Sequence, residues 1–313
     1  MAPRPILIDT DPGQDDAVAI LLALATRDRL EVLGLTCVSG NVPLERTALN
    51  ARTICELAGR PDLPVCAGCD RPMGRDLVTA EHVHGQSGLD GPDLPAPRMS
   101  LHPAHAVDFL IDTLRAHPPG TVTLVALGPL TNLATAFQTA PDIVAKLHEI
   151  VLMGGAHAAL GNVTPVAEFN IHVDPIAADI VLRAGARVVM VPLDVTHKAL
   201  VTPERNAALR AIDTPVGRAA ADLTGFFERY NPARYGEEGA PLHDPCTIAW
   251  LLRPDLFASR PVNVTVETQS DLTLGMTVMD WWGVTGRAPN ATVLHEIDAD
   301  GFFDLLTERL ATL

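Results

Sequence analysis

The stretch that most constrains the fold lies near the N-terminus, where a short apolar run meets a group of acidic residues and then a longer apolar run. Ile6-Leu7-Ile8 reads as a buried strand. The run 17–25 predicts a helix, because its apolar residues recur at helical spacing on one face. These residues are Val18, Leu21, Leu22 and Ala25. Between the runs, Asp9-Thr10-Asp11-Pro12-Gly13-Gln14-Asp15-Asp16 forms a strand-to-helix turn, where open α/β sheets place their ligand sites.

The acidic residues of this turn indicate a metal site. Four carboxylates within eight positions repel one another unless protons or a cation offset their charge. Oxygen ligands favour a hard cation, Ca²⁺ or Mg²⁺, over zinc. The simpler alternative is that these acids only favour a helix N-terminus and cap a turn. That alternative explains two acids better than four, and we therefore predict metal binding here.

The same order of strand, polar turn and helix recurs along the chain. Further strands are expected at 30–38, from 65, and at 121–127, 149–153 and 186–193, with helices at 44–58, 104–116 and 133–138. This alternation implies parallel pairing through right-handed crossovers. We found no repeat or linker, so the sequence predicts a single α/β domain over 1–313, with an open, mostly parallel sheet flanked by helices. Strands at 262–267 and 292–297 and a helix at 302–310 complete it.

Residues 76–97 show no periodic pattern of apolar residues. They include a polar segment that contains His84 and three spaced glycines, Gly85, Gly88 and Gly91. A loop of this kind is either a mobile lid over a site or an ordinary surface loop. The spacing alone favours neither.

Composition narrows the class of partner. The net charge is 23 − 38 = −15 with histidines neutral, which argues against nucleic acid or a membrane surface and favours a neutral small molecule. The longest apolar run is far shorter than the ~20 residues of a membrane span, and the N-terminus lacks the apolar segment of a secretory signal. Five scattered cysteines suit a reduced, cytoplasmic protein. Cys66 and Cys69 have redox-motif spacing, but we favour a structural role for them.

Four segments together resemble the calcium-dependent nucleoside hydrolases of the inosine–uridine-preferring type. They are Asp9 to Asp16, Val151-Leu152-Met153-Gly154-Gly155, Ala167-Glu168-Phe169-Asn170 and His243-Asp244-Pro245-Cys246. The resemblance spans essentially the whole chain. It implies the Rossmann-like fold of that family and hydrolysis of ribonucleosides to ribose and a free base. It also implies one Ca²⁺ per subunit and a homodimer or homotetramer that acts in nucleoside catabolism and base salvage.

The resemblance assigns the metal ligands. They would be the carboxylates of Asp11, Asp16 and Asp244 and the main-chain carbonyl of Leu127. Calcium takes six to eight oxygens, so the remaining positions suit a water and two ribose hydroxyls. For Asp244 alone, a helix cap before Pro245 is the alternative.

The resemblance also assigns positions that bind the nucleoside. They are Asp15, Asn41, Met153, Asn162, Glu168, Phe169 and Asn170. In extended backbone, Glu168 and Asn170 would point the same way and grip neighbouring ribose hydroxyls. Met153 would form an apolar wall beneath the sugar, although a place in the core is equally consistent with its sequence context.

The reaction passes through a cationic ribosyl transition state, which nearby negative charge stabilises. With calcium orienting a water, Asp11 would take its proton as the general base. His243, next to Asp244, is the first candidate for donating a proton to the leaving base. His84 is the second, and it would alternatively stabilise the sugar or the base. For His82 and His172 we favour structural roles.

The base pocket is expected just before the His243-Asp244 pair. Tyr230 and Arg234 are the candidate base contacts, since an aromatic ring can stack on a nucleobase. Phe226 stands where broad-specificity relatives tend to carry a tyrosine, which leaves the choice between purine and pyrimidine open.

Two other functions remain as alternatives. In a Mg²⁺-dependent phosphohydrolase an aspartate of the turn would attack phosphorus, but such an enzyme needs cationic groups near the turn, and the sequence has none there. A non-catalytic protein that binds a ribosyl ligand would keep Glu168 and Asn170 but would have no use for a water-activating acid.

Overall fold

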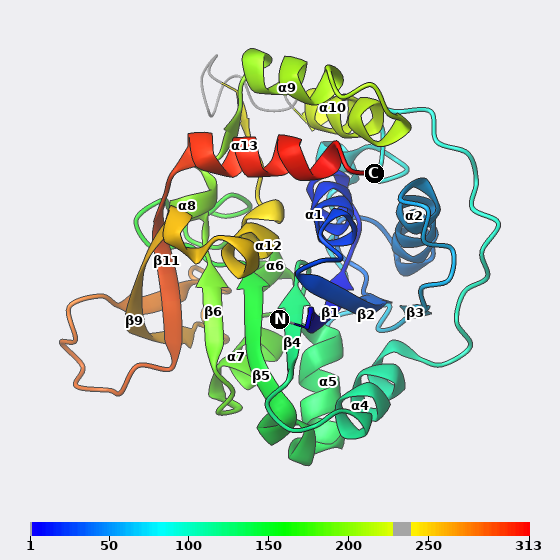
Figure 1. Ribbon diagram of the computed structural model, residues 1–313. Helices are drawn as coiled ribbons and strands as arrows, with labels where there is room; N and C mark the ends of the chain where they lie inside the picture. The colour runs from blue at the N-terminus through cyan, green and yellow to red at the C-terminus, as the bar shows by residue number, and fades with distance from the viewer. Residues whose placement is uncertain (1, 228–238) are drawn as a thin grey trace.

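A nine-stranded sheet forms the centre of the protein. The computed structural model describes residues 2–227 and 239–313 (Figure 1). In these residues the strand order of the sheet is β10-β9-β11-β6-β5-β4-β1-β2-β3. The strands are β1 (Arg4–Thr10), β2 (Leu30–Cys37), β3 (Val65–Ala67), β4 (Val122–Ala126), β5 (Leu147–Met153), β6 (Val188–Val191), β9 (Phe257–Val266), β10 (Thr277–Asp280) and β11 (Ala291–Ile297). Neighbours from β3 to β11 pair in parallel, whereas β9 pairs antiparallel with both β11 and β10. The predicted open, mostly parallel sheet is confirmed.

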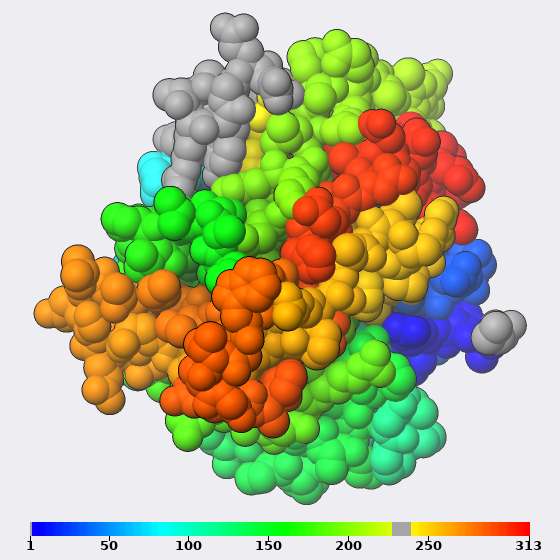
Figure 2. All heavy atoms as spheres, turned by 90° about the vertical axis from the view of Figure 1, so that its left-hand side faces the viewer, coloured from blue at the N-terminus to red at the C-terminus, as the bar shows by residue number. Residues whose placement is uncertain are grey.

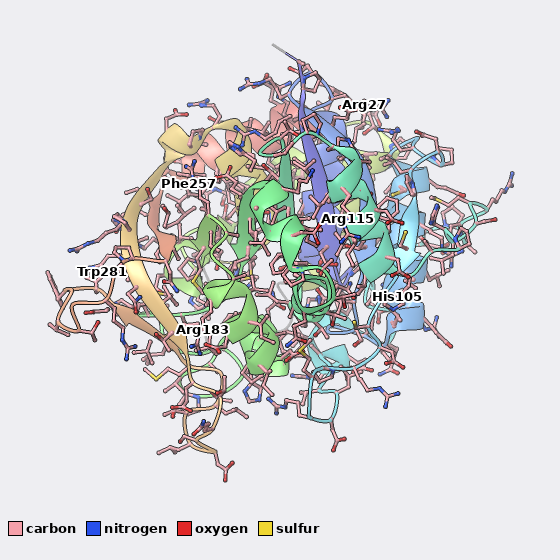
Figure 3. The ribbon with its side chains drawn as sticks, turned by 90° about the horizontal axis from the view of Figure 1, so that it is seen from below. Arg27, His105, Arg115, Arg183, Phe257 and Trp281 are labelled. Carbon is pink, nitrogen blue, oxygen red and sulfur yellow. The ribbon has the colours of Figure 1, made fainter. Side chains whose placement is uncertain are left out.

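Helices cover both faces of the sheet, because alternate residues of its strands point to opposite sides. Ile6 and Ile8 of β1 belong to one apolar core and Leu7 to another. The first core contains α1 (Gln14–Ala25), α2 (Leu44–Leu57), α10 (Pro215–Phe227), α12 (Pro245–Leu252) and α13 (Ala299–Leu310). The second contains α4 (Ala106–Ala116), α5 (Thr131–Thr139) and α7 (Pro175–Arg183). Figure 3 shows α4 and α7 from below, with Arg115 and Arg183 near their C-terminal ends.

Short elements make up the rest of the described structure. They are α3 (Glu81–His84), α6 (Phe169–Val173), α8 (Leu193–Thr196), α9 (Pro203–Arg210), the paired strands β7 (Leu200–Val201) and β8 (Ala240–Pro241), and 3-10 turns at Pro141–Lys146 and Pro254–Leu256. Helix α3 falls within the 76–97 segment that the sequence left irregular. It brings His84, which is buried, into the interior.

Helix α1 differs from the prediction of a single apolar face. Every residue from Gln14 to Leu24 is buried, because α1 contacts β2 on one side and α2, α10, α12 and α13 on the others. The predicted helix is confirmed, and its remaining faces are buried as well because other helices surround it. As a consequence, the acidic residues at its N-terminus lie inside the molecule.

Strand β9 also differs, since it begins at Phe257 rather than at 262. Its first residues are partly exposed, so they lack the apolar alternation from which the strand was predicted. Between β9 and β11 the chain projects from one side of the molecule (Figures 1 and 2), where Trp282 and Val284 are 79% and 83% exposed.

The five cysteines are free thiols. Cys66 is buried in β3, and Cys69 lies half-buried near the Thr135 hydroxyl, which is consistent with a structural role for the pair. Among the helices of residues 2–227 and 239–313, none combines the length and the apolar character needed to cross a membrane.

Candidate active site

A cleft opens where the chain leaves the carboxyl ends of the central parallel strands. Including space open to solvent, its volume is about 870 Å³. Its lining includes the predicted site residues Asp15, Asn41, His84, Leu127, Met153, Asn162, Glu168, Phe169, Asn170, His243 and Asp244. Asp11 and Asp16 are fully buried and do not line it. Tyr230 and Arg234 lie outside the described residues.

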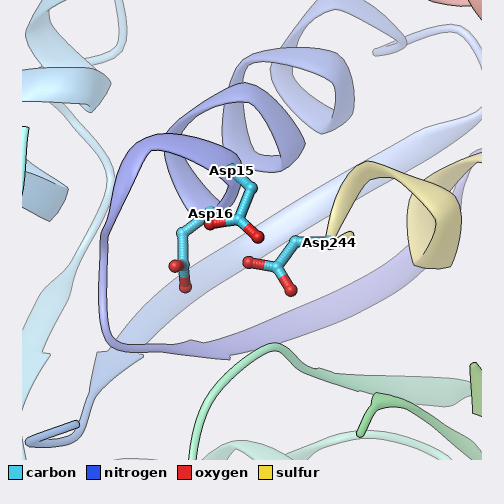
Figure 4. Close-up of side chains that lie close together, drawn as sticks. All are labelled: Asp15, Asp16 and Asp244. Atoms are coloured by element: carbon cyan, nitrogen blue, oxygen red, sulfur yellow. The ribbon is translucent and has the colours of Figure 1, made fainter. Parts of the chain in front are cut away.

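Asp15, Asp16 and Asp244 form an acid cluster (Figure 4), of which Asp15 and Asp244 line the cleft. Each of these residues offers a carboxylate oxygen within 4.8 Å of the others. Asp15 and Asp16 come from the first turn of α1, and Asp244 directly precedes α12. Although Asp244 stands at the N-cap of α12, its side chain makes no capping hydrogen bond. A cap therefore does not explain Asp244, and its carboxylate faces the other two acids instead.

Asp16 is held by hydrogen bonds to both of its carboxylate oxygens. Oδ1 accepts from the Thr10 hydroxyl at 2.6 Å and from the Asp11 N–H at 3.2 Å. Oδ2 accepts from the Gly13 N–H at 3.0 Å and from Asn41 Nδ2 at 3.1 Å. The contact with Gly13 is a helix cap, so the simpler alternative accounts for part of the role of Asp16.

The Asp11 carboxylate is closely packed against Gly40 and Gly128, an arrangement called here the Asp11 cradle. Its Oδ2 accepts from the Asn41 N–H at 2.8 Å, whereas Oδ1 is buried with no hydrogen-bond partner among the described residues. A Cβ added at Gly40 would fall 2.1 Å from Oδ2, and one added at Gly128 would fall 2.2 Å from Oδ1. A buried, unpartnered carboxylate oxygen is costly, and a hard cation is the natural partner for it. The residues present therefore fit a hard cation, although the carboxylates that lie together are those of Asp15, Asp16 and Asp244 rather than the predicted Asp11, Asp16 and Asp244.

The pKa values of the acidic residues support the same conclusion. Burial raises the pKa of Asp15 to about 7, with Asp16 adding to the effect. Burial, followed by repulsion from neighbouring carboxylates, raises the pKa of both Asp11 and Asp244 well above the usual range. Burial also raises the pKa of Asp16. Four carboxyl groups at this site resist simultaneous ionisation unless a cation compensates them.

The predicted extended backbone is wrong at Asn170, which lies in α6, whereas Glu168 itself has extended φ and ψ angles of −80° and 149°. Glu168 is the N-cap of α6. Its Oε1 accepts from the Asn170 N–H at 2.9 Å, and Oε2 accepts from the Gly155 and Ile171 N–H groups at 3.0 and 3.2 Å. A carboxylate that satisfies the first N–H groups of a helix favours helical backbone over a strand. Both side chains nevertheless line the cleft, and burial raises the pKa of Glu168 to about 7.

Asn170 joins α6 to the ends of β4 and β5. Its Nδ2 donates to the Leu127 carbonyl at 2.7 Å and to the Met153 carbonyl at 3.2 Å. A carbonyl oxygen has two lone pairs, so this contact leaves Leu127 with a lone pair for a metal. Met153 lines the cleft and also packs with Ala156 and Leu193, so it is both a wall and a core residue. Asn162 Oδ1 accepts from the Phe169 N–H at 2.9 Å.

Two buried histidines face the cleft. Nδ1 of His84 lies 2.6 Å from Gln14 Oε1, and Nδ1 of His243 lies 2.7 Å from the Thr196 hydroxyl. Burial lowers the pKa of His84 to about 3, and burial followed by repulsion from His197 lowers the pKa of His243 well below its usual value. Both rings are therefore neutral imidazoles near neutral pH.

Sequence reasoning missed several residues of the site. His82 and Val83, from the same segment as His84, line the cleft, although His82 was predicted to be structural. Gln14 and Thr196 contact the two histidines. The signal for Gln14 was its place within the acidic turn, whereas nothing in the sequence set Thr196 apart. His172 is half-buried, with Nδ1 3.3 Å from the Leu274 carbonyl, and does not line the cleft.

Phe226 lines a different hollow, together with Ser87, Asp90 and Asp222. The described residues therefore place Phe226 outside the lining of the cleft. The base contacts predicted for its neighbours fall within 228–238.

Comparison with known proteins shows the family to which the chain belongs. The sequence profile of the inosine-uridine preferring nucleoside hydrolases matches residues 6–304. The pyrimidine-specific ribonucleoside hydrolase RihA of Citrobacter koseri is 50% identical over 308 residues, which cover 98% of both chains. The purine-preferring ribonucleoside hydrolase of Gardnerella vaginalis superposes with a TM-score of 0.91 at 32% identity, covering 98% of both chains. A plant nucleoside hydrolase, PpNRh1, superposes with a TM-score of 0.90 at 34% identity, covering 99% of both chains. The chain therefore belongs to the inosine-uridine preferring nucleoside hydrolase family and is a nucleoside hydrolase.

Proposed function

We propose that this enzyme uses Ca²⁺ and water to cleave the N-glycosidic bond of ribonucleosides, releasing ribose and a free base. The observation that carries the proposal is the buried group of acids at the cleft, with Asp11 Oδ1 lacking a partner among the described residues. Glu168 and Asn170 line the same cleft. This arrangement suits a divalent ion and a polyhydroxylated ligand in one place.

One Ca²⁺ per subunit would be held by the carboxylates of Asp11, Asp16 and Asp244 and by the Leu127 carbonyl. When bound, the ion supplies positions for ribose hydroxyls and favours deprotonation of a water. Asp11 accepts that proton as the general base. Asp15 is 7% exposed at the cleft, whereas Asp11 and Asp16 are fully buried. This difference supports contact of Asp15 with the sugar.

The remaining polar residues of the cleft bind the ribose. Asn41, Asn162, Glu168 and Asn170 are the candidates, with Met153 and Phe169 beside them. The Glu168 carboxylate provides negative charge that stabilises the positive charge developing on the sugar ring. Several of these side chains already hold backbone groups, so their positions are set before the substrate arrives.

The leaving base needs a hydrogen-bond donor as it departs. His243 is the first candidate, since a neutral imidazole still carries one N–H group, and His84 is the second. Tyr230 and Arg234 remain predictions for contacts with the base.

The base preferred by this enzyme is proposed to be a pyrimidine. The support is the 50% identity to the pyrimidine-specific RihA, against 32% to the purine-preferring enzyme. A panel of uridine, cytidine, inosine and adenosine tests this, and kcat/KM is expected to be highest for uridine or cytidine. A higher kcat/KM for inosine would overturn the preference and leave hydrolysis intact.

The central experiment incubates the purified enzyme with uridine in the presence of Ca²⁺ or of a chelator and measures reducing sugar. Ribose formed only with Ca²⁺ supports the proposal. Phosphate released from a phosphoester would support a phosphohydrolase, although no Lys or Arg side chain of the described part of the chain lines the cleft. Stabilisation by ribose without product would support a binding protein. Light scattering after gel filtration tests the proposed homodimer or homotetramer.

A further inference from the structure

Gln14 stands among the acids of the first turn, yet the proposed reaction does not use it. Its side chain is 1% exposed. Nε2 donates to the main-chain carbonyls of His84 and Asp90 at 2.9 and 3.1 Å. Oε1 lies 2.6 Å from Nδ1 of His84. One amide therefore joins the start of α1 to both the ring and the backbone of the segment that carries His84.

These contacts fix which way the amide points. Two carbonyl oxygens accept hydrogen bonds and cannot donate them, so the atom near both must be the NH₂ group. The other atom is then the oxygen, which only accepts. Nδ1 of His84 must therefore carry the hydrogen of this contact. In a neutral imidazole Nε2 is then an acceptor, and the burial of the ring favours the neutral form.

His243 differs at the corresponding atom. Its Nδ1 partner is the Thr196 hydroxyl, which either donates or accepts. Thr196 therefore tolerates the tautomer in which Nε2 of His243 carries the hydrogen. Gln14 excludes that tautomer for a neutral His84.

We propose that Gln14 is a positioning residue that holds His84 as the Nδ1–H tautomer. In this form, Nε2 of His84 accepts a hydrogen bond from a hydroxyl or N–H group of the nucleoside. Donation to the leaving base then falls to His243 rather than to His84. The assignment of the nucleoside as the donor rests on the proposed function, whereas the tautomer itself does not.

Asn50 provides a matched control, because it anchors the same segment without touching the ring. Its Nδ2 donates to the Pro12 carbonyl at 2.9 Å and to the Ser87 carbonyl at 2.8 Å. Gln14 and Asn50 thus both join the acidic turn to the segment that follows α3. Only Gln14 contacts Nδ1 of His84. A purely structural role for Gln14 predicts that variants of the two residues behave alike.

The tautomer is measured by long-range ¹H–¹⁵N correlation spectra of the Ca²⁺-loaded enzyme labelled at histidine, with His84 assigned from the signal lost in His84→Gln. Wild type and Asn50→Leu are expected to carry the hydrogen on Nδ1. Gln14→Met, which has no acceptor oxygen at this place, is expected to shift the hydrogen wholly or partly to Nε2. Gln14→Glu keeps an acceptor for Nδ1, and in its protonated form its O–H replaces one of the two donations to the His84 and Asp90 carbonyls. It is expected to retain Nδ1–H, so it tests the proposal even if Gln14→Met does not fold. A neutral His84 ring with its hydrogen on Nε2 in wild type or in folded Gln14→Glu, or pure Nδ1–H in folded Gln14→Met, would overturn it.

Kinetics provide the second readout. Loss of one neutral hydrogen bond to the substrate is expected to lower kcat/KM of Gln14→Met for uridine by roughly ten-fold, mainly through KM. Gln14→Glu is expected to lose less kcat/KM than Gln14→Met. Asn50→Leu measures how much kcat/KM is lost when the segment is loosened without any change at the His84 ring. A ten-fold loss confined to kcat would argue that His84 is the proton donor and would overturn the proposal. If wild type hydrolyses no nucleoside, the proposed function fails while the tautomer measurement still stands.

Discussion

At the scale of single residues, the two oxygens of Asp11 have unequal surroundings. Oδ2 accepts from a backbone N–H, and Oδ1 is buried without a partner among the described residues. We expect Asp11→Asn to keep the fold and to lose ~10²–10⁴-fold in kcat, the range of general acid–base catalysis, together with affinity for Ca²⁺. Steady-state kinetics and calcium titration measure the two effects.

Asp9→Asn is the matched control for Asp11→Asn. Asp9 Oδ1 accepts from the Thr36 hydroxyl at 2.5 Å and from Asn132 Nδ2 at 2.8 Å, contacts that an amide oxygen preserves, while Oδ2 has no partner among the described residues. This variant is expected to remain within a few-fold of wild type. Near-normal turnover in Asp11→Asn would refute the role of Asp11 as the base.

His243→Ala tests assistance to the leaving base. Uridine needs a donor near the base, whereas p-nitrophenyl riboside releases a stable anion without one. We expect kcat to fall ~10²–10⁴-fold for uridine and far less for the activated substrate. Equal losses on both substrates would contradict donation by His243.

The residues of the site could be predicted from the sequence only where they belong to a motif. Asp15, Asp244, Asn170 and His243 were found through the resemblance and line the cleft, whereas Asp11 and Asp16 are fully buried and do not. Gln14 and Thr196 escaped prediction because their importance lies in which atom faces a histidine. Such contacts join residues far apart in the chain, and no spacing rule encodes them.

At the scale of elements, the turns after the strands are shaped around the Asp11 carboxylate. We expect Gly40→Ala and Gly128→Ala to weaken Ca²⁺ binding and lower kcat by at least roughly ten-fold, because the new methyl group would meet Asp11 at 2.1 and 2.2 Å. Calcium titration and uridine turnover measure this. Gly225→Ala in α10 is the control, since the nearest atom to its added Cβ is 3.5 Å away. Wild-type calcium affinity in both Gly40→Ala and Gly128→Ala would contradict the idea that close packing around Asp11 is needed for calcium binding.

Elements were predictable where periodicity alone determines them, and were missed where side chains decide the backbone. The mostly parallel pairing followed from the alternation of strands and helices, whereas the strand order was not predicted. Helix α6 was missed because its start depends on the Glu168 carboxylate accepting from backbone N–H groups, among them that of Gly155. The complete burial of α1 was missed because it depends on helices from the far end of the chain.

At the scale of the whole molecule, the buried acids couple stability to pH and to calcium. Burial holds the folded-state pKa values of Asp11, Asp15, Asp16 and Asp244 above their unfolded values. The folded, calcium-free protein therefore binds more protons than the unfolded chain, and its stability falls as pH rises through the folded pKa, about 7 for Asp15. We expect Tm without Ca²⁺ to fall between about pH 5 and about pH 8.

Calcium is expected to reverse this loss. At one hundred times Kd the ion adds about 2.7 kcal/mol of stability, and the gain in Tm should be larger at about pH 8 than at about pH 5, because protons compete for the same carboxylates. Thermal denaturation with calcium or a chelator at each pH measures both effects. A calcium-free Tm that is constant or rises with pH would contradict this coupling.

The acid cluster takes Asp15 and Asp16 from the first helix and Asp244 from a helix near the other terminus. During synthesis, Asp15 and Asp16 are made early, and the cluster is complete only after Asp244 has been added. A nascent or truncated chain that ends before Asp244 lacks one of the proposed ligands, so we expect it to bind Ca²⁺ more weakly than the complete chain.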